Sequence, residues 1–485
     1  MNRELRRLSI VLLAMFLALF GATSWIQVIQ VDTLADNPNN TRALYDSYQV
    51  QRGAIIAGGA AIAYSVPSDD VYSFQRVYND GDMWAPVTGY INPMLGSATA
   101  LESAMNQELS GTAGSQFLQR VEQIITGQKP QGSNVVLSLD PQVQRAAYEA
   151  LGDLEGAVIA IEPDTGRVLA MVTSPSYDTN QLAVHNAEQV AATYDALESD
   201  DLDPLSNRAI AGDLNPPGST FKLVVASAAI SSGEYTPEST FDNPAQWQLP
   251  GSSDFISNAG GGTCGPGETV SLATALALSC NIPMAQLAVE LGDNAIREEA
   301  EKYGFNSAFE MPLVSTPSTY PRALDDAETA LSGFGQGDVR ATPLQMAMVS
   351  AGIANDGLVM NPRMVDRVIA PDLSVQQQFE DTEFQRALNE EDAATMAEMM
   401  VANVRDGIAS GARIDGVEVA GKTGTAENGP AAPYTLWFTG YAPADDPQVA
   451  VAVVIENGGG LGQAGQSNRI AAPIGKAVME AVLNR

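Results

Sequence analysis

The hydrophobic pattern begins with one long apolar run near the N-terminus. Three arginines lie within the first seven residues, and residues 8–29 are then almost all apolar, with Trp25 near the end of the run. Basic residues before such a run predict a membrane-spanning helix with a cytoplasmic N-terminus. The most apolar part ends at Phe20, a length that also fits a cleaved signal peptide. We interpret residues 1–7 as a cytoplasmic tail and residues 8–29 as an uncleaved transmembrane anchor.

The next stretch, residues 31–133, is polar and mixed, with repeated Pro and Gly breaks. Apolar positions over residues 101–125 have helical spacing, and residues 127–133 have the composition of a linker. No group of side chains here carries recognisable chemistry. We therefore interpret residues 31–133 as a small noncatalytic domain that acts as a spacer.

From residue 134 to residue 485 the pattern changes to short β-rich runs and apolar helices. A helix is predicted to open at Asp140, an acidic N-cap followed by Pro141. Residues 188–203 are acidic, and we interpret them as a mobile insertion. Short β-rich runs predict an antiparallel sheet flanked by helices, an α+β fold. The predicted strands cover residues 135–139, 156–162, 167–172, 417–421, 436–441 and 449–455.

Residues 215–222, Asn-Pro-Pro-Gly-Ser-Thr-Phe-Lys, lead into an almost wholly apolar helix over residues 223–230. The prolines and the glycine block an earlier helix start, so Ser219 falls in the first turn, where unpaired N–H groups favour negative charge. Lys222 lies on the same face one turn later. Burial lowers the pKa of its ammonium, and the neutral amine can then take the serine proton. Alone, the pattern also fits an N-cap serine with a surface lysine.

A second short motif, Ser279-Cys280-Asn281, follows about sixty residues later, where a helical pattern breaks before Pro283. The amide of Asn281 can bind a substrate carbonyl, and the hydroxyl of Ser279 can relay a proton between Lys222 and a leaving amine. An isolated Ser-x-Asn is otherwise typical of a helix end or a turn.

A third motif, Lys422-Thr423-Gly424-Thr425, continues a predicted strand. Gly424 allows a substrate backbone to approach closely, and the N–H of Thr425 can join that of Ser219 in an oxyanion hole. Lys422 can attract a terminal carboxylate or steady the proton relay. The alternative is an exposed lysine in a β-turn.

Composition narrows the chemistry. The chain of 485 residues has a formal net charge of −33, which argues against binding of nucleic acid and against broad electrostatic binding to anionic lipid. Its single histidine, His185, lies in a polar stretch and is interpreted as a surface residue. A Ser-His-Asp triad would need that residue, and a histidine-rich metal site is excluded. We expect no metal and no cofactor, with lysine as the base.

The two cysteines, Cys264 and Cys280, are sixteen positions apart. With the bulk of the chain placed outside the membrane, a disulfide between them is permitted, and two separate buried thiols are the alternative. We expect the disulfide. It would tie the second motif to the glycine-rich loop of residues 260–265.

Together, in this order, the three motifs resemble those of β-lactamases and penicillin-binding proteins, with Cys280 at a position where that set has Asp. Gln51-Arg52-Gly53-Ala54-Ile55 resembles the box that follows the anchor in class B penicillin-binding proteins. Residues 333–347 resemble another stretch of that family, which we assign to packing beneath the site. The resemblance is carried mainly by residues 134–485.

This resemblance implies a penicillin-binding/β-lactamase-like transpeptidase domain, preceded by the noncatalytic domain and the anchor. It implies a D,D-transpeptidase that cross-links peptidoglycan stem peptides through a serine acyl-enzyme, in wall synthesis and division, and that is acylated by β-lactam antibiotics. The expected location is the cell membrane, single-pass, with the catalytic domain outside the cytoplasm. Cell-division and wall-synthesis proteins are the expected partners.

Two other classes of function remain open. A D,D-carboxypeptidase or β-lactamase on the same fold needs a positioned water, and between the second and third motifs the chain has no Glu-x-x-Leu-Asn element like that of class A β-lactamases. A β-lactam sensor or division scaffold would not need catalysis. A sensor would be expected to carry further membrane spans or a cytoplasmic signalling domain.

Overall fold

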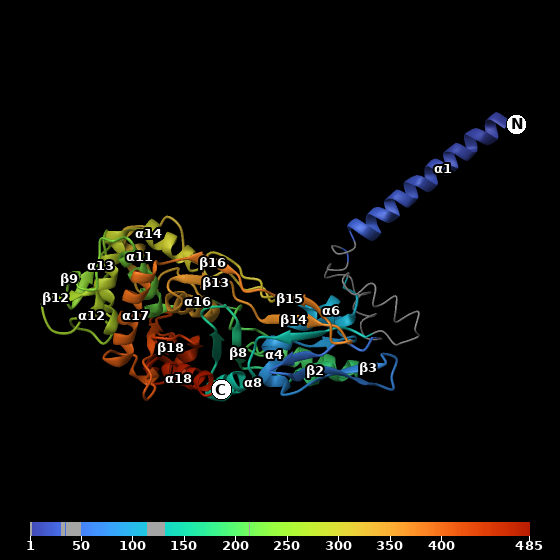
Figure 1. Cartoon of the computed structure of the whole chain (residues 1–485). Coiled ribbons are helices and arrows are strands. Elements are labelled where there is room, and N and C mark those ends of the chain that lie inside the picture. Colours follow the sequence, from blue (N-terminus) through green and yellow to red (C-terminus); the bar gives the residue numbers. More distant parts are fainter. Residues whose placement is uncertain (1, 31–33, 35–49, 114–130, 213) are drawn as a thin grey trace.

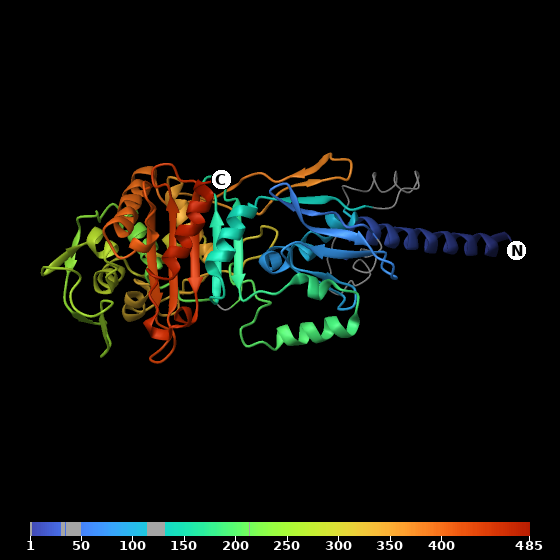
Figure 2. The ribbon, with the colours of Figure 1, turned by 90° about the horizontal axis from the view of Figure 1, so that it is seen from below.

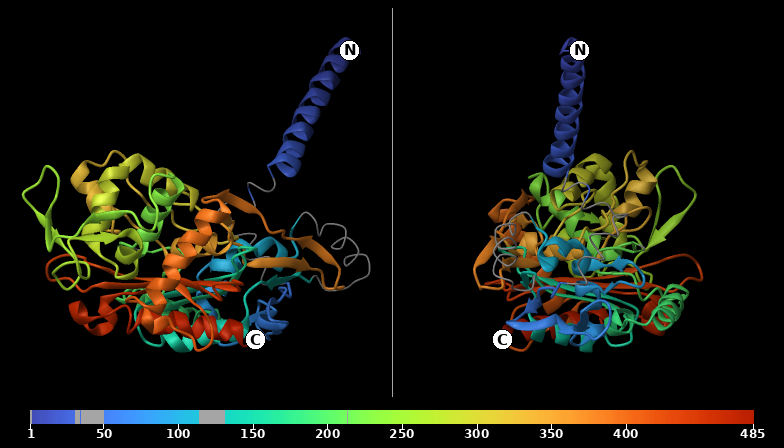
Figure 3. Two further views of the ribbon diagram at one scale, coloured as in Figure 1. Left: turned by 60° about the vertical axis from the view of Figure 1, so that its left-hand side comes forward. Right: turned by 90° about the vertical axis from the view of Figure 1, so that its right-hand side faces the viewer.

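The computed structural model describes residues 2–30, 34, 50–113, 131–212 and 214–485. Helix α1 (Asn2–Ser24) continues into the short π-helix η1 (Trp25–Ile29) and lies apart from the folded body (Figures 1 and 3). Within Arg3–Gln27, an 18-residue window of this helix has a mean hydropathy of 2.1, and none of that window is buried. By length and composition it can cross a membrane, as the predicted anchor requires.

A five-stranded antiparallel sheet forms the centre of the larger unit, in the order β17-β18-β19-β7-β8. Strand β19, near the C-terminus, pairs with β7, so strands far apart in sequence lie side by side (Figure 2). The predicted hairpin and the three predicted C-terminal strands are present. The strands are β7 (Gly156–Ile161), β8 (Val168–Ser174), β17 (Ala420–Ala426), β18 (Thr435–Ala442) and β19 (Val449–Ile455).

Helices cover both faces of this sheet, which is why its strands are almost entirely buried. Helices α8 (Pro141–Leu151) and α18 (Ala471–Leu483) pack together on one face, and α16 (Pro343–Ala354) packs on the other. Helix α8 begins as predicted, because the Asp140 carboxylate accepts hydrogen bonds from the N–H groups of Gln142 and Val143.

Beyond α16 lies a mostly helical region that carries the first two motifs (Figure 1). The predicted apolar helix is α11, whose residues from Lys222 to Ile230 are all buried. Two small two-stranded antiparallel sheets, β9–β12 and β10–β11, flank the helices. The bounds are η3 (Gly218–Phe221), α11 (Lys222–Ser231), β9 (Thr240–Asp242), β10 (Gln246–Gln248), β11 (Phe255–Ser257), β12 (Thr269–Ser271), α12 (Leu272–Ala277), α13 (Asn281–Leu291), α14 (Asp293–Lys302), α15 (Asp326–Ser332) and α17 (Glu390–Arg405).

A second sheet of six strands joins both sides of the predicted boundary between residues 133 and 134. Strand β6 pairs in parallel with β1 and antiparallel with β14, which comes from the C-terminal part of the chain. We call this sheet and the helices packed on it the N-terminal unit. Its strands come from three separate stretches of sequence. The strand order is β15-β14-β6-β1-β2-β3, with bounds Val375–Gln378, Val365–Ile369, Asn134–Leu137, Ile55–Ala57, Ala60–Pro67 and Phe74–Tyr78.

Two local predictions were wrong. The helix predicted over residues 101–125 is interrupted at Met105, giving α5 (Ala100–Ala104) and α6 (Asn106–Ser110), while residues 114–130 lie outside the described part of the chain. Where we expected a mobile insertion, residues 187–198 form helix α10 (Ala187–Glu198), whose N-terminus is capped by the Asn186 side chain. Its acidic composition had suggested mobility, but buried Val190 fixes one face of the helix.

The remaining short elements connect these units. Helix α4 (Gly81–Thr88) packs against α5, α8, α9 and the end of β8. The others are β4 (Ile91–Asn92), β5 (Ser97–Ala98), α9 (Thr179–Ala183), β13 (Leu358–Met360), β16 (Glu383–Arg386), η4 (Ser410–Ala412), η5 (Asn457–Gly460) and η6 (Gly462–Ala464).

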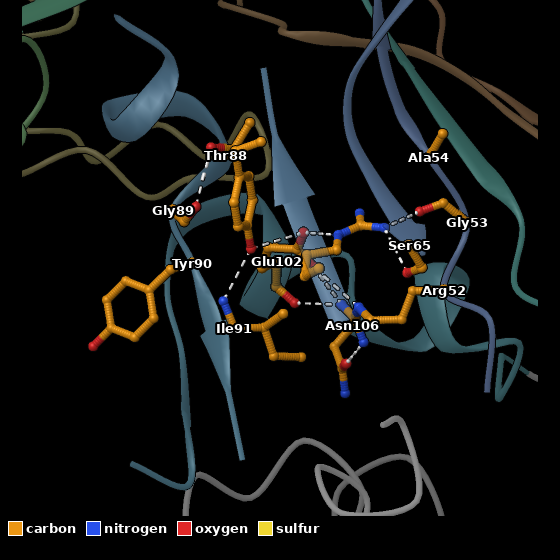
Figure 4. A network of polar contacts seen from close by, with 12 residues as sticks. Arg52, Gly53, Ala54, Ser65, Thr88, Gly89, Tyr90, Ile91, Glu102 and Asn106 are labelled. Atoms are coloured by element: carbon orange, nitrogen blue, oxygen red, sulfur yellow. Dashed lines mark hydrogen bonds and ion pairs between the residues drawn. The ribbon is translucent and has the colours of Figure 1, made fainter. Parts of the chain in front are cut away.

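A buried ionic network holds the N-terminal unit together (Figure 4). The carboxylate of Glu102 on α5 accepts hydrogen bonds from Arg52 Nη2 at 2.8 Å and from Arg76 Nε at 2.5 Å. Glu102 is fully buried, and each arginine is 4% exposed. The Tyr78 hydroxyl also donates to Glu102, and Arg52 Nη1 donates to Asn106. Glu102 thus joins Arg52, from the box near the anchor, to Arg76 and Tyr78 on β3.

Replacing Glu102 with alanine should destabilise this unit strongly, because it leaves two buried guanidinium groups without their counter-ion. Breaking a buried ion pair from one side typically costs about 3–5 kcal/mol. As a control, Arg145→Ala removes the exposed ion pair with Asp80 and should cost less than about 1 kcal/mol. Urea unfolding of both variants in detergent measures the difference, and equal small losses would contradict this account of the network.

Candidate active site

Ser219 lies in η3, a 3₁₀ turn that runs directly into α11, rather than in the first turn of the α-helix as predicted. The preceding loop is held by hydrogen bonds from Trp437 Nε1 to the Pro216 carbonyl, 2.9 Å, and from the Gly218 N–H to the Gly335 carbonyl, 3.0 Å. Gly218 has a φ of +53°, and a Cβ there would lie 2.9 Å from the Thr425 carbonyl oxygen. Only glycine lets the loop reach this strand without strain.

The Lys222 side chain is fully buried, and its Nζ donates toward the second motif. The acceptors are the Ser279 carbonyl at 2.7 Å, Asn281 Oδ1 at 2.9 Å and, more weakly, Ser279 Oγ at 3.4 Å. The structure has no hydrogen bond between Lys222 Nζ and the Ser219 hydroxyl. The two groups lie one turn apart, and Ser219 is half-buried.

The second motif occupies the break between α12 and α13, as predicted. Ser279 adopts a left-handed φ of +57°, which ends one helix and turns its side chain inward. Its Oγ accepts a 2.6 Å hydrogen bond from Lys422 Nζ and lies 3.4 Å from Lys222 Nζ. One hydroxyl therefore lies between the two lysines, and Ser279 as a whole residue is 4% exposed.

The third motif forms β17, the edge strand of the central sheet. Its outer edge lies against η3, where a Cβ on Gly424 would be 2.8 Å from the Pro217 carbonyl oxygen. Lys422 Nζ also donates to the Thr423 carbonyl at 2.9 Å. Thr423 is buried. The Thr425 hydroxyl is hydrogen-bonded to the hydroxyl of Ser467 at 2.8 Å.

Burial makes both lysines weak bases. Loss of hydration, with a further contribution from the charge of Lys422, holds the pKa of Lys222 well below its ordinary value. Burial also lowers the pKa of Lys422 to about 7. Neither amine has a carboxylate among its hydrogen-bond partners. At neutral pH, a neutral Lys222 amine can accept a proton from a hydroxyl.

Cys264 and Cys280 are joined by a disulfide, which ties the second motif to the glycine-rich loop. Asn258 lies two residues before this loop, and its side chain contacts the start of α13. Sequence reasoning missed Asn258 and Ser467, since neither lies in a recognisable motif. The turn at residues 333–337 does lie beneath the nucleophile loop, through the contact between Gly335 and Gly218.

His185 is not a surface residue as predicted, because its side chain is only 8% exposed. Its Nδ1 bonds the carboxylate of Asp70, and its ring packs against Tyr72 at 5.0 Å between centroids. These contacts place His185 against the N-terminal unit. It makes no contact with Ser219 or Lys222.

Across the described ranges, no three side chains of His, Cys, Asp or Glu gather in a way that would hold a metal ion. The side chains joined by the hydrogen bonds of Lys222 and Lys422 are amines, a hydroxyl and an amide. These groups suit proton transfer and carbonyl binding.

Two parts of the chain match known families. Residues 156–480 match the penicillin binding protein transpeptidase domain, and residues 52–135 match the penicillin binding protein A dimerisation domain. The second match ends within β6, which the N-terminal unit shares with the C-terminal part of the chain.

Individual relatives agree with these matches. The chain is 40% identical to the peptidoglycan D,D-transpeptidase PbpA of Mycolicibacterium smegmatis, over 100% of this chain and 99% of the relative. It is also 40% identical to PbpA of Mycobacterium tuberculosis, with the same coverage. The structure of penicillin-binding protein A from M. tuberculosis, as a ceftriaxone acyl-enzyme complex, superposes with a TM-score of 0.87 over 90% of this chain and 100% of that one. The chain therefore belongs to the penicillin-binding protein transpeptidase family.

Proposed function

We propose that this chain is a peptidoglycan D,D-transpeptidase that cross-links stem peptides through an acyl-enzyme on Ser219 and is acylated there by β-lactams. The observation that carries the proposal is the hydrogen-bonded series of Lys222, Ser279 and Lys422 beside the Ser219 turn. The full-length similarity to proteins named peptidoglycan D,D-transpeptidase supports it.

Acylation begins with the neutral amine of Lys222. Its two N–H groups are directed at the Ser279 carbonyl and at Asn281 Oδ1, which leaves the nitrogen lone pair to take the proton of Ser219. Ser219 Oγ then attacks the carbonyl carbon of the penultimate D-Ala. The N–H groups of Ser219 and Thr425 are the proposed donors to the oxyanion.

Collapse of the intermediate requires a proton on the leaving amine of the terminal D-Ala. Ser279 Oγ gives this proton and recovers one from protonated Lys222, so Lys222 ends the step neutral. The 2.6 Å hydrogen bond from Lys422 holds the Ser279 hydroxyl in place during the exchange. Lys422 and the Thr425 hydroxyl are the groups we assign to the terminal carboxylate of the donor peptide.

The acyl-enzyme is then resolved by an amine from a second stem peptide, which enters where the first amine left. The amine gives a proton to Ser279 Oγ as Ser279 passes its own proton to Lys222, and the Lys222 ammonium returns a proton to Ser219 Oγ as the ester bond breaks. Transfer is favoured over hydrolysis because neither lysine is hydrogen-bonded to a carboxylate that would activate water.

We further propose that residues 1–7 are cytoplasmic, that residues 8–29 anchor the chain as a single span, and that the catalytic part lies outside the cytoplasm. The apolar helix and the disulfide support this placement, because disulfides persist in oxidising compartments. Residues 134–485 contain the proposed catalytic residues, and residues 31–133 contribute most of the N-terminal unit, which acts as a spacer. Cell-division and wall-synthesis proteins are the proposed partners.

A labelled penicillin should form a long-lived ester on Ser219, located by intact mass and peptide mapping. Lys222→Met should lower the acylation rate by at least about a hundredfold, since positioned general bases contribute about 10²–10⁴. Lys476→Met, at a partly exposed lysine, is the matched control and should react normally. Label on Ser279, or normal acylation of the Lys222 variant, would refute the Ser-Lys mechanism.

The acylation rate should depend on pH in a way that reports the lowered lysine pKa values. Protons added to Lys222 remove the base, so the rate falls as pH falls. Because the charge that Lys422 gains near pH 7 disfavours a second charge on Lys222, the fall should set in well below the ordinary lysine pKa. Between about pH 8 and about pH 10 the rate should be flat, whereas a base with an ordinary lysine pKa would give a rate that rises through this range. Stopped-flow acylation with a chromogenic cephalosporin measures the profile.

With an ester or thioester mimic of a D-Ala-D-Ala stem, an added D-amino acid should divert product to the exchanged peptide and speed turnover. An amine is the expected acceptor, so product analysis by mass spectrometry should show exchange above hydrolysis. Fast hydrolysis with neither rate nor product changed by the D-amino acid would instead identify a D,D-carboxypeptidase.

A further inference from the structure

Helix α13 starts at Asn281 with no side-chain cap of its own. Cys280 occupies the N-cap position, but its sulfur is in the disulfide and accepts no hydrogen bond from the helix. The first N–H groups of a helix need acceptors from elsewhere. Asn258 supplies them, since its Oδ1 accepts from the Asn281 N–H at 2.9 Å and from the Ile282 N–H at 3.1 Å. A residue 23 positions earlier in the chain thus caps the helix that carries the second motif.

The Asn281 side chain is fixed from the same segment. Its Oδ1 accepts from Lys222 Nζ at 2.9 Å, and its Nδ2 donates to the carbonyl of Ser257, the neighbour of Asn258, at 3.1 Å. The carbonyl of Ser257 therefore sets which end of the amide faces the lysine. An amide nitrogen carries two hydrogens, so one N–H of Asn281 remains for a substrate carbonyl.

Asn258 is itself held in one position. Its side chain is 6% exposed, and its Nδ2 donates to the Gly262 carbonyl at 3.0 Å. Gly260, Gly261 and Gly262 all have positive φ, which lets the chain turn back on itself toward Cys264. The disulfide then closes this loop onto Cys280, beside the helix start that Asn258 caps.

We infer that Asn258 is a positioning residue for the acylation step, acting through Asn281. It holds the first turn of α13, and with it the Asn281 amide that orients the Lys222 amine and the substrate carbonyl. This inference rests on the proposed transpeptidase function. Because small misplacements of a catalytic constellation cost large factors in rate, loss of this cap should be visible in acylation even where the fold survives.

A double-mutant cycle on penicillin acylation tests the inference. Asn258→Ala should lower the second-order acylation rate by about tenfold or more. Asn281→Ala should lower it at least as much. If Asn258 acts through Asn281, adding Asn258→Ala to Asn281→Ala should change the rate by less than about twofold. If the double variant instead shows the product of the two single-variant rate losses, the inference is overturned, because a general structural role of Asn258 predicts independent effects.

Two further variants separate positioning from stability. Asn258→Asp keeps an oxygen at the helix start, where negative charge is favoured, but loses the donor to the Gly262 carbonyl, so it should recover part of the acylation rate that Asn258→Ala loses. Asn243→Ala removes an equally buried amide that bonds the backbone of Cys264 and Gly267 but does not touch the motif. It should lower Tm comparably while acylation by the folded protein stays within about threefold of the wild type. Failure of Asn258→Asp to recover any of the lost rate would count against the inference.

Asn258→Ser replaces the alanine variant in the cycle if that protein does not fold, because the shorter side chain cannot reach both N–H groups. The wild-type protein is measured in the same assay. If it is not acylated at all, the proposed function fails. If it is acylated and the cycle is multiplicative, only the role of Asn258 fails.

Discussion

Two lysine amines buried on either side of one hydroxyl are the constraint on which the rest of this site depends. A buried ammonium without a counter-ion is costly, so each amine is driven toward its neutral form, and the charge of one disfavours a charge on the other. Lys222 thereby becomes a base without a histidine or a carboxylate. The surrounding carbonyls and hydroxyls accept its hydrogens without restoring its positive charge.

This arrangement needs elements from distant parts of the chain to meet closely. Helix α11 brings Lys222, the break after α12 brings Ser279, and the edge strand β17 brings Lys422. Glycines at 218 and 424 allow η3 and β17 to approach to backbone contact. The pairing of β19 with β7 joins the early hairpin β7–β8 to the C-terminal strands in one sheet. This sheet holds its edge strand β17 beside the nucleophile loop.

Much of this was predictable because the signals are local. Proline and glycine before an apolar helix mark the nucleophile turn, and Asp140 with Pro141 marks the start of α8. Long-range pairing was not predictable. Nothing near residue 134 shows that β6 pairs with β14, some 230 residues later, so the predicted boundary falls within a shared sheet. Asn258 was missed for the same reason, since its role depends on a helix start 23 positions away.

The central claim is that Lys222 is a neutral amine at neutral pH, and its protonation state can be measured directly. The chain has only five lysines, so ¹³C and ¹⁵N labelling of lysine side chains gives few signals, and Lys222→Met assigns the one that matters. The account predicts that the Lys222 signal has the shift of a neutral amine at pH 7.5 and gains a proton only at lower pH. A Lys222 signal that remains that of an ammonium up to about pH 10, as for an ordinary lysine, would contradict it.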